Sequence, residues 1–372
     1  MRQRAGVIRI ASVLLGLSLL PAYACENPRS DPAGCSEPFD AGGPIELDWP
    51  RSLMVVQQSG GAAAIRVRGR LVDVAPEPLL ARYRGGPWQR IDVDPASGEF
   101  DARLASAPVG WGAVDVVLER DPTVGTTVST VGIGNVVVLA GQSNMVMMLA
   151  TRSYTRKGAT VLGRRRDPAD PHAIAWAADP LHDCLDQTGS IWPALGDRLI
   201  RGSGGTPLMF VATSVGATGL ASTGQWLPAD GGRFVSMLDE VRTATAEQMC
   251  VSALLWLQGE TDANFGVSRE AYRDALVAFA AGVENAMACR VPVVAGVIGR
   301  IEEDILIDPD AADAIRQGTL DAIDASPDLY PGPWTYDLPI HNLHFADDAA
   351  GPLLDRWCAA IGEAPTGLRC SP

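Results

Sequence analysis

The stretch from Val136 to Met145, with the sequence VVVLAGQSNM, is the strongest constraint on how this chain can fold. Its first half is a continuous apolar run rich in β-branched residues, which is typical of a strand buried on both faces. The run breaks at Gly141, and Ser143 follows at once. Because ligands bind beyond the carboxyl ends of strands in open α/β sheets, Ser143 is a candidate reactive residue, although it can equally be a simple helix cap. The residues that follow predict the start of a helix: Met145, Met147, Met148 and Leu149.

Later apolar runs predict three more buried strands, at Leu208–Ala212, Ala253–Leu257 and Val291–Ile298. Helical patterns lie between them, because apolar residues recur on one face of each intervening segment. This alternation predicts an α/β domain over residues 135–365, with a parallel sheet that helices cover on both faces. The segment Thr151–Ser190 has little periodicity, and we expect a long loop over the active face. The apolar helical positions are Phe234, Leu238 and Val241, and then Tyr272, Leu276, Phe279 and Val283.

Residues 44–134 follow a period of two instead. Ile65 and Val67 alternate with arginines, and turn sequences such as Gly85-Gly86-Pro87 separate the runs. Short alternating strands of this kind predict a small all-β sandwich domain ahead of the α/β domain. Its default role is packing or spacing.

The first 24 residues resemble an export signal, with a positively charged start and an apolar stretch from Ile10 to Leu20 that is short for a membrane span. Cleavage after Ala24 would leave Cys25 as the first mature residue, which suggests a lipid anchor, but Tyr23 fits a lipoprotein signal poorly. Lipidation and plain secretion both stay open. Residues 25–43 are rich in Pro, Gly, Ser and Asp and predict a tether, and residues 366–372 form a short tail. We expect a periplasmic, secreted or outer-membrane lipoprotein of a bacterium, with no transmembrane segment.

Cysteine usage agrees with export. In an exported protein, cysteines form disulfides more often than metal sites, and the positions predict the pairs Cys250–Cys289 and Cys358–Cys370. The sequence has no CxxC or HExxH spacing and only four histidines, so we expect no metal site. An odd number of cysteines leaves one outside intramolecular pairs, and acylation would account for it. The seven are Cys25, Cys35, Cys184, Cys250, Cys289, Cys358 and Cys370.

The formal net charge is -14. Binding to nucleic acid needs clustered Lys and Arg, but Lys157 is the single lysine and Arg164–Arg166 is the one dense basic run. We therefore expect no nucleic-acid partner.

Polar residues gather where the predicted strands end. The second strand is followed by SVGATGL from Ser214 to Leu220, and the third leads into QGETDA from Gln258 to Ala263. A late segment, DLPIHNLHF, runs from Asp337 to Phe345. A serine, a histidine, a glycine turn and a side-chain amide at strand ends are what acyl transfer requires: a nucleophile, a base and donors for the oxyanion.

The motifs GQSNM, WLQGETD and a late His-Phe, in this order, resemble those of the SGNH-hydrolase superfamily. Within it they are similar to the sialate O-acetylesterase and acetylxylan esterase-like branch. The resemblance covers Val136 to about Gly362. It implies a flavodoxin-like α/β/α fold and a carbohydrate O-acetylesterase that needs no cofactor.

The resemblance also implies roles for four residues. Ser143 would be the nucleophile and its own N–H an oxyanion donor, Gly216 would supply a second backbone donor, and Gln258 a side-chain donor. His344 would be the base. Each has a plainer alternative: Gly216 as an ordinary turn glycine, Gln258 as an amide that orders a loop, and His344 as a buried structural imidazole.

One position departs from the family pattern. The branch commonly has an aspartate three residues before the base, and here that residue is His341. A histidine cannot stabilise an imidazolium by charge, so another acid would have to orient His344. Asp337 and Glu260 are the candidates, and Asp337 is preferred because it belongs to the same segment as His344.

The sequence therefore predicts a serine esterase that removes O-acetyl groups from a carbohydrate substrate, which is its one expected partner. Two alternatives remain: an esterase or lipase for non-sugar esters, and a non-catalytic carbohydrate-binding protein on a decayed hydrolase fold. The absence of the usual aspartate at position 341 favours the non-catalytic alternative. The particular sugar and the oligomeric state have no readable signature.

Overall fold

The computed structural model describes residues 43–162, 173–181, 188–229, 231–302 and 307–371. The predicted export signal, nearly all of the tether, Arg164–Arg166, and Cys25, Cys35 and Cys184 lie outside these residues. The chain divides into two units, 1–35 and 36–372, and all described residues belong to the second. No helix among them is long and apolar enough to span a bilayer.

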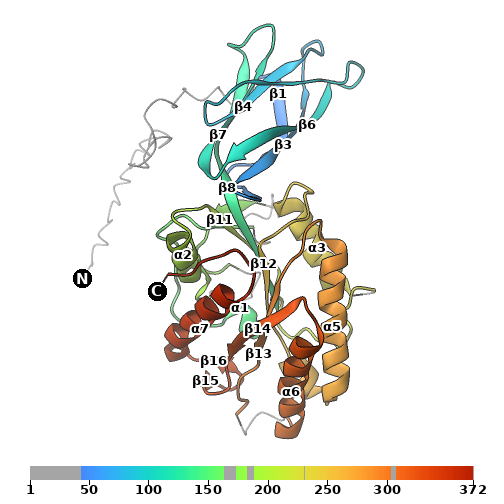
Figure 1. The fold of residues 1–372 in the computed structure, drawn as a ribbon, viewed down its shortest axis with the longest axis vertical. Helices are drawn as coiled ribbons and strands as arrows, with labels where there is room; N and C mark the ends of the chain where they lie inside the picture. The colour runs from blue at the N-terminus through green and yellow to red at the C-terminus, as the bar shows by residue number, and fades with distance from the viewer. Residues whose placement is uncertain (1–42, 163–172, 182–187, 230, 303–306, 372) are drawn as a thin grey trace, which may run out of the picture. The chain divides into compact units, whose positions relative to one another are not determined.

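A twisted sheet forms the centre of the C-terminal part, with the strand order β10-β9-β11-β8-β12-β13-β14 (Figure 1). All neighbours pair in parallel except the edge strand β10. The order β11-β8-β12-β13-β14 is the 2-1-3-4-5 order of flavodoxin-like sheets, which bind ligands where the order reverses, between β8 and β12. The strands are β8 (Gly125–Gly141), β9 (Thr160–Leu162), β10 (Ile174–Trp176), β11 (Leu208–Ala212), β12 (Ala253–Leu257), β13 (Val293–Val297) and β14 (Leu329–Trp334).

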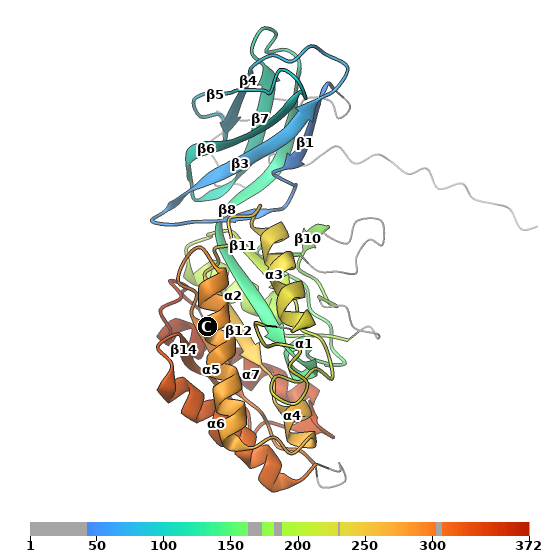
Figure 2. The same ribbon diagram turned by 90° about the vertical axis from the view of Figure 1, so that its right-hand side faces the viewer.

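Helices cover both faces of this sheet: α2 and α7 lie on one side, and α3, α5 and α6 on the other (Figures 1 and 2). The apolar positions predicted for α5, such as Tyr272 and Phe279, are buried against the sheet. The three strands predicted after β8 are also present, so the prediction of an α/β fold is confirmed. The helices are α1 (Ser143–Val146), α2 (Trp192–Gly202), α3 (Gly232–Ala244), α4 (Glu260–Asn264), α5 (Arg269–Ala286), α6 (Pro309–Ala325) and α7 (Ala350–Glu363), with a 3-10 turn at Asp347–Ala349.

The N-terminal part consists of β strands with a core of their own, to which the alternating Ile65 and Val67 contribute. Strands β1, β3 and β6 form a three-stranded sheet, and β4, β5 and β7 join the first half of β8. Strand β8 continues without a break into the central sheet, so the overall sheet mixes parallel and antiparallel pairs. The strands are β1 (Ile45–Trp49), β2 (Val55–Gln57), β3 (Ala62–Leu71), β4 (Leu79–Tyr83), β5 (Gln89–Ile91), β6 (Glu99–Pro108) and β7 (Gly110–Leu118).

Two local predictions were only partly right. The helix after Ser143 lasts only one turn, because Met147 takes a positive φ of 62° and its N–H closes the turn on the carbonyl of Ser143. The segment 151–190 is not simply a loop, because it contributes β9 and β10 to the edge of the central sheet.

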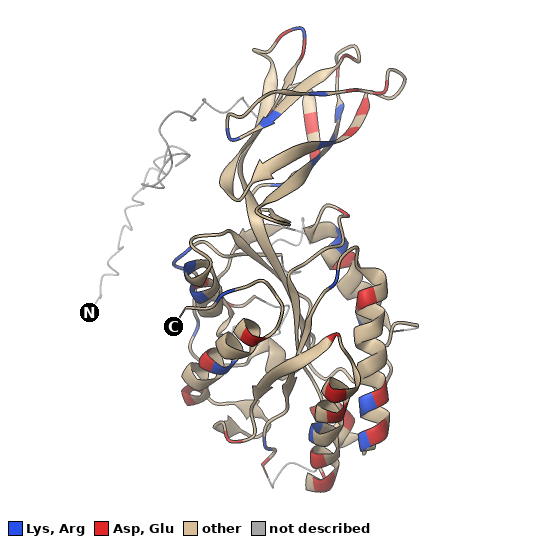
Figure 3. Ribbon diagram, in the orientation of Figure 1, with Lys and Arg blue, Asp and Glu red and all other residues tan. Residues whose placement is uncertain are grey.

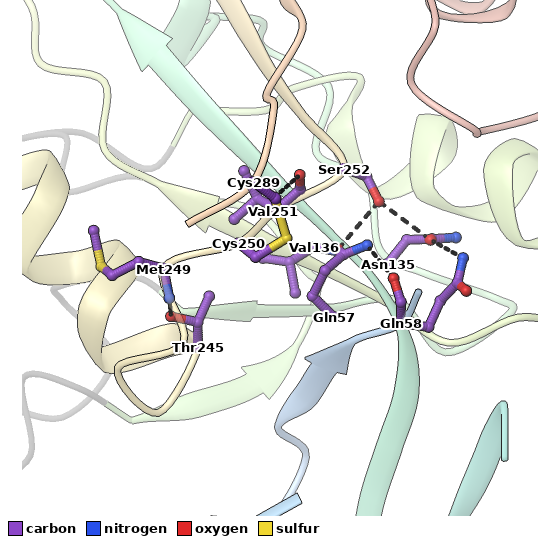
Figure 4. The surroundings of a disulfide bond; sticks show 10 residues. All are labelled: Gln57, Gln58, Asn135, Val136, Thr245, Met249, Cys250, Val251, Ser252 and Cys289. Atoms are coloured by element: carbon purple, nitrogen blue, oxygen red, sulfur yellow. Dashed lines mark hydrogen bonds between the residues drawn. A yellow bond between two sulfur atoms is a disulfide. The ribbon is translucent and has the colours of Figure 1, made fainter. Parts of the chain in front are cut away.

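Both predicted disulfides are present. Cys250 and Cys289 lie just before β12 and β13, with their Cα atoms 5.3 Å apart, and Cys358–Cys370 joins α7 to the C-terminal tail. Figure 4 shows the first disulfide beside a hydrogen-bonded group of residues from β2, from β8 and from the segment just before β12. In that group the Gln57 side-chain oxygen accepts hydrogen bonds from the Val136 backbone N–H and the Ser252 hydroxyl, at 2.8 and 3.1 Å.

Candidate active site

Ser143 lies at the carboxyl end of β8, where the chain turns sharply into α1. Gly141 makes this turn possible: its φ is 136°, and a Cβ there would lie 2.2 Å from the carbonyl oxygen of Leu257 on β12. The turn aims the Ser143 hydroxyl at His344, and Oγ is 3.0 Å from the imidazole Nε2. A serine and a histidine at hydrogen-bond distance can act as nucleophile and base in acyl transfer.

His344 is carried by a two-stranded hairpin, β15 (Ile340–His341) and β16 (His344–Phe345). Its turn uses Asn342 at a φ of 60°, a conformation that asparagine tolerates better than most residues. Phe345 is buried and anchors the hairpin in the core. Partial burial lowers the pKa of His344. The imidazole is therefore neutral at neutral pH and can accept the proton of a serine.

Asn144 links the turn that carries Ser143 to this hairpin. Its Nδ2 donates to the backbone carbonyl of Leu343 at 2.8 Å and to Glu260 Oε1 at 2.5 Å. Glu260 is buried, and this burial raises the pKa of its carboxyl group. Its second oxygen has no hydrogen-bond partner in the described part of the chain. Glu260 thus faces Asn144, and its known contacts do not include His344.

Two backbone N–H groups are free beside the serine. Those of Ser143 and Gly216 make no hydrogen bond to any described residue. Ser143 begins a helix, where the first N–H groups have no acceptor within the helix. A Cβ placed on Gly216 would lie 3.7 Å from the Ser143 Cβ, so the glycine lies directly beside Ser143. The pair suits an oxyanion, which needs preorganised donors next to the attacking oxygen.

Gln258 is fully buried, and its amide is already occupied. Nε2 donates to Gln142 Oε1 at 3.0 Å, to the Thr218 carbonyl at 3.0 Å and to Asp262 Oδ2 at 2.6 Å. Oε1 accepts from the Tyr272 hydroxyl at 3.1 Å. The predicted oxyanion role of Gln258 does not fit these contacts, because a buried amide with three acceptors on its nitrogen has no donor left for a substrate.

Gln142, which the sequence reasoning overlooked, has the opposite arrangement. Its Oε1 accepts from Gln258 Nε2 and from the backbone N–H groups of Gly259 and Thr261, at 3.4 and 3.2 Å. Its Nε2 has no hydrogen-bond partner among the described residues. Unlike the unpartnered atoms of the core, this nitrogen is not fully buried. The signal in the sequence was its position directly before Ser143.

Asp262 holds the loop that carries Gly216. Its carboxylate accepts from the backbone N–H groups of Leu220, Ala221 and Ser222, at 2.6 to 2.8 Å. A buried carboxylate that accepts several backbone N–H groups fixes a loop firmly. The conformation after β11 therefore depends on a residue that follows β12.

Asp337, the preferred acid, is engaged elsewhere. Its two oxygens bind the Arg356 guanidinium at 2.7 Å each, and this pairing lowers the pKa of Asp337 to about 2. His341 is exposed, and in the hairpin it is paired with His344 through the backbone. No described carboxylate accepts a hydrogen bond from His344. Among the described residues, the candidate site thus contains a Ser–His pair with no carboxylate hydrogen-bonded to the histidine.

Ser143 and His344 lie within hydrogen-bond distance at the switch point of a flavodoxin-like sheet, where such sheets bind ligands. Residues 133–330 match the family described as carbohydrate esterase, sialic acid-specific acetylesterase. They make up more than half of the chain, so the chain belongs to this family. It is a carbohydrate O-acetylesterase, and the resemblance inferred from its motifs is confirmed. His344 and its hairpin follow the matched residues.

Solved structures agree on the fold. A carbohydrate acetylesterase from Xanthomonas citri superposes with a TM-score of 0.63 and 15% identity, over 87% of this chain and 76% of that one. A protein from Arabidopsis thaliana superposes with a TM-score of 0.50 and 16% identity, over 61% of this chain and 98% of that one. No curated protein matches the sequence at a significant level.

Proposed function

We propose that the chain deacetylates carbohydrates through Ser143 as nucleophile and His344 as base. The observation that carries this proposal is the 3.0 Å distance between Ser143 Oγ and His344 Nε2. It is supported by the two free N–H groups beside the hydroxyl and by the position of the pair at the carboxyl edge of the sheet.

In the proposed reaction, His344 Nε2 takes the Ser143 proton as Oγ attacks the acetyl carbonyl. The negative charge that develops on the carbonyl oxygen is held by the N–H groups of Ser143 and Gly216. When the tetrahedral intermediate collapses, the imidazolium returns its proton to the sugar oxygen, which leaves as an alcohol. Water, activated by His344, then attacks the acetyl-serine ester and releases acetate.

The third oxyanion donor in our proposal is the Gln142 side chain rather than Gln258. Three hydrogen bonds fix Gln142 Oε1, so the direction of the amide is set while Nε2 keeps both hydrogens. Gln258 becomes a positioning residue, which orients the Gln142 amide by donating a hydrogen bond to its Oε1.

The proposed base works as half of a dyad. The hairpin and the Asn144–Leu343 hydrogen bond hold the imidazole in place of an orienting carboxylate, and Glu260 in turn holds Asn144. We therefore assign Glu260 a positioning role and give Asp337 none. Loss of the acid from a serine triad costs on the order of 10⁴-fold in turnover, so a modest rate is expected.

The division of the chain also stays a proposal: signal 1–24, tether 25–43, β domain 44–134, esterase domain 135–365 and tail 366–372. Two disulfides support folding in an oxidising compartment and hence export. A lipid anchor at Cys25 is the more specific hypothesis.

Acetate release from a panel of O-acetylated sugars, measured for the wild type and Ser143→Ala, tests the function. We expect the wild type to release acetate and Ser143→Ala to lose at least a thousandfold in turnover. Ser97→Ala, in an exposed turn of the N-terminal part, is the matched control and should keep the wild-type rate. Hydrolysis of non-sugar esters alone would favour the lipase alternative. Sugar binding without any acetate release would favour the decayed fold.

A further inference from the structure

We propose that a cavity beside Trp334 binds a neutral sugar unit of an acetylated polysaccharide, so that the enzyme acts on uncharged polymers. This rests on the proposed function, because it supplies the sugar chain whose acetyl groups reach Ser143. The cavity has a volume of about 450 Å³ and lies between the end of β14 and helix α7. The lining residues that carry the argument are Trp334, Asp337, Arg356 and Glu363.

An exposed tryptophan, Trp334, lines this cavity, and Tyr336 lies next to it outside the lining. The side chains of Trp334 and Tyr336 are 43% and 42% exposed, and their ring centroids are 6.1 Å apart. Most tryptophans in this chain pack in the core, as Trp192 and Trp256 do. Large apolar side chains left together at a surface mark interaction sites. A sugar ring has an apolar C–H face that packs on a flat indole, which makes Trp334 the expected platform.

Polar groups with fixed geometry line the same cavity as the indole. The Arg356 guanidinium is held by the Trp334 carbonyl and by both oxygens of Asp337. Such bidentate pairs are rigid, and they leave lone pairs and N–H groups for sugar hydroxyls. One aromatic wall with a few oriented polar groups is the usual composition of a small-ligand pocket.

The charges of the cavity select a neutral ligand. Asp337 and Glu363 carry two negative charges against the one positive charge of Arg356, which is already paired. The formal net charge of the whole chain is -14. Figure 3 shows acidic and basic residues interspersed over the described part of the chain. An anionic sugar such as a sialic acid would meet repulsion here, whereas an uncharged one would not.

The cavity lies at the same edge of the sheet as Ser143. Trp334 ends β14 at the carboxyl edge of the sheet, the edge at which Ser143 follows β8. Three strand intervals separate β8 from β14, or about 14 Å at about 4.8 Å per strand. Ten residues after Trp334 the chain reaches His344. A polymer held at Trp334 therefore keeps its acetyl groups at a high effective concentration near Ser143.

The experiment measures binding apart from catalysis. In the Ser143→Ala background, affinity gel electrophoresis and calorimetry would use three probes: acetylated glucomannan and acetylated xylo-oligosaccharides, which are neutral, and polysialic acid, which is anionic. We expect binding to at least one neutral probe and none to polysialic acid. Trp334→Ala should weaken binding about tenfold, or 1.4 kcal/mol, and Trp334→Tyr should restore most of it because a flat ring remains.

Activity gives a second readout. In the active enzyme, Trp334→Ala should raise KM for the neutral polymer and leave hydrolysis of 4-nitrophenyl acetate unchanged, because the small ester does not reach the cavity. Trp88→Ala removes another exposed indole, on the N-terminal part, and is the matched control. Wild-type binding by Trp334→Ala, an equal loss with Trp88→Ala, or preference for polysialic acid would overturn the proposal. A wrong nucleophile would instead leave esterase activity in Ser143→Ala, so the two failures differ.

Discussion

Gln142→Glu is the most informative single substitution, because it replaces only Nε2 by oxygen. The oxygen Oε1 keeps its three donors, from Gln258, Gly259 and Thr261, so the turn before Ser143 should retain its shape. The lost group, Nε2, bonds no described residue in the resting enzyme, so its removal should leave no protein acceptor unpaired. The loss would be felt only when an oxyanion forms.

The expected cost follows from that difference. Removing one oxyanion donor lowers turnover by about 10² to 10³, or about 2.7 to 4 kcal/mol of transition-state stabilisation. A carboxylate in its place adds repulsion toward the oxyanion, so the effect should be at least this large at about pH 8, where the new side chain is ionised. We expect kcat to fall by this factor in an acetate-release assay, with KM and the melting temperature little changed.

Gln258→Glu is the matched control, because it makes the same chemical change in the fully buried residue that donates to Gln142. There the new oxygen would face Asp262 Oδ2, now 2.6 Å from Nε2, and two further acceptors. Buried like charges without a donor destabilise the fold, so the melting temperature should drop clearly. Turnover of Gln142→Glu within threefold of the wild type would refute the donor role of Gln142. A melting temperature for Gln258→Glu equal to that of the wild type would refute its role behind Gln142.

Three further predictions concern the base, the unused acid and a disulfide. Burial lowers the pKa of His344, and the neutral imidazole is the active form, so kcat/KM should rise with pH and reach half its plateau below pH 6.5; a midpoint above 7 in the pH profile would indicate a hidden carboxylate partner. Asp337→Asn should change turnover on a small acetyl ester by less than about twofold, since the residue pairs with Arg356; a larger loss would return it to the catalytic site. Replacing Cys250 and Cys289 by serine opens a link across 39 positions and should lower the unfolding free energy by about 4 kcal/mol in urea titrations, whereas an unchanged midpoint would show that the link adds nothing.

The features that could be predicted from the sequence are those set by local pattern. The continuous apolar run of β8 is buried, as its pattern predicts, and Gly141 takes the positive φ that the turn before Ser143 requires. The disulfide between Cys250 and Cys289 was predictable because both residues precede parallel strands separated by one helix. Each of these inferences needs only neighbours along the chain or one topological rule.

Two expectations do not fit the hydrogen bonds that these side chains make, because several partners compete for each polar group. Gln258 was expected to face the substrate, but Asp262 and Gln142 offer buried acceptors that bind its amide first. Asp337 was expected to reach His344, but Arg356 on α7 offers a full opposite charge. Spacing along the chain carries no information about which of several partners a polar side chain finds. Free donors, such as Gln142 Nε2, emerge only once every hydrogen bond has been counted.

The uninterrupted course of β8 limits how this enzyme can be rearranged. Its residues Gly132–Gly134 pair with β2, and a few positions later the same strand pairs with β11 and β12. Gln57 also satisfies the Val136 N–H inside the central sheet. A cut at residue 135 would therefore remove part of the strand that leads to Ser143. Because β8 belongs to both parts, a truncated variant that begins at residue 135 would lack the strand pairing with β2 and β7 that the intact chain has.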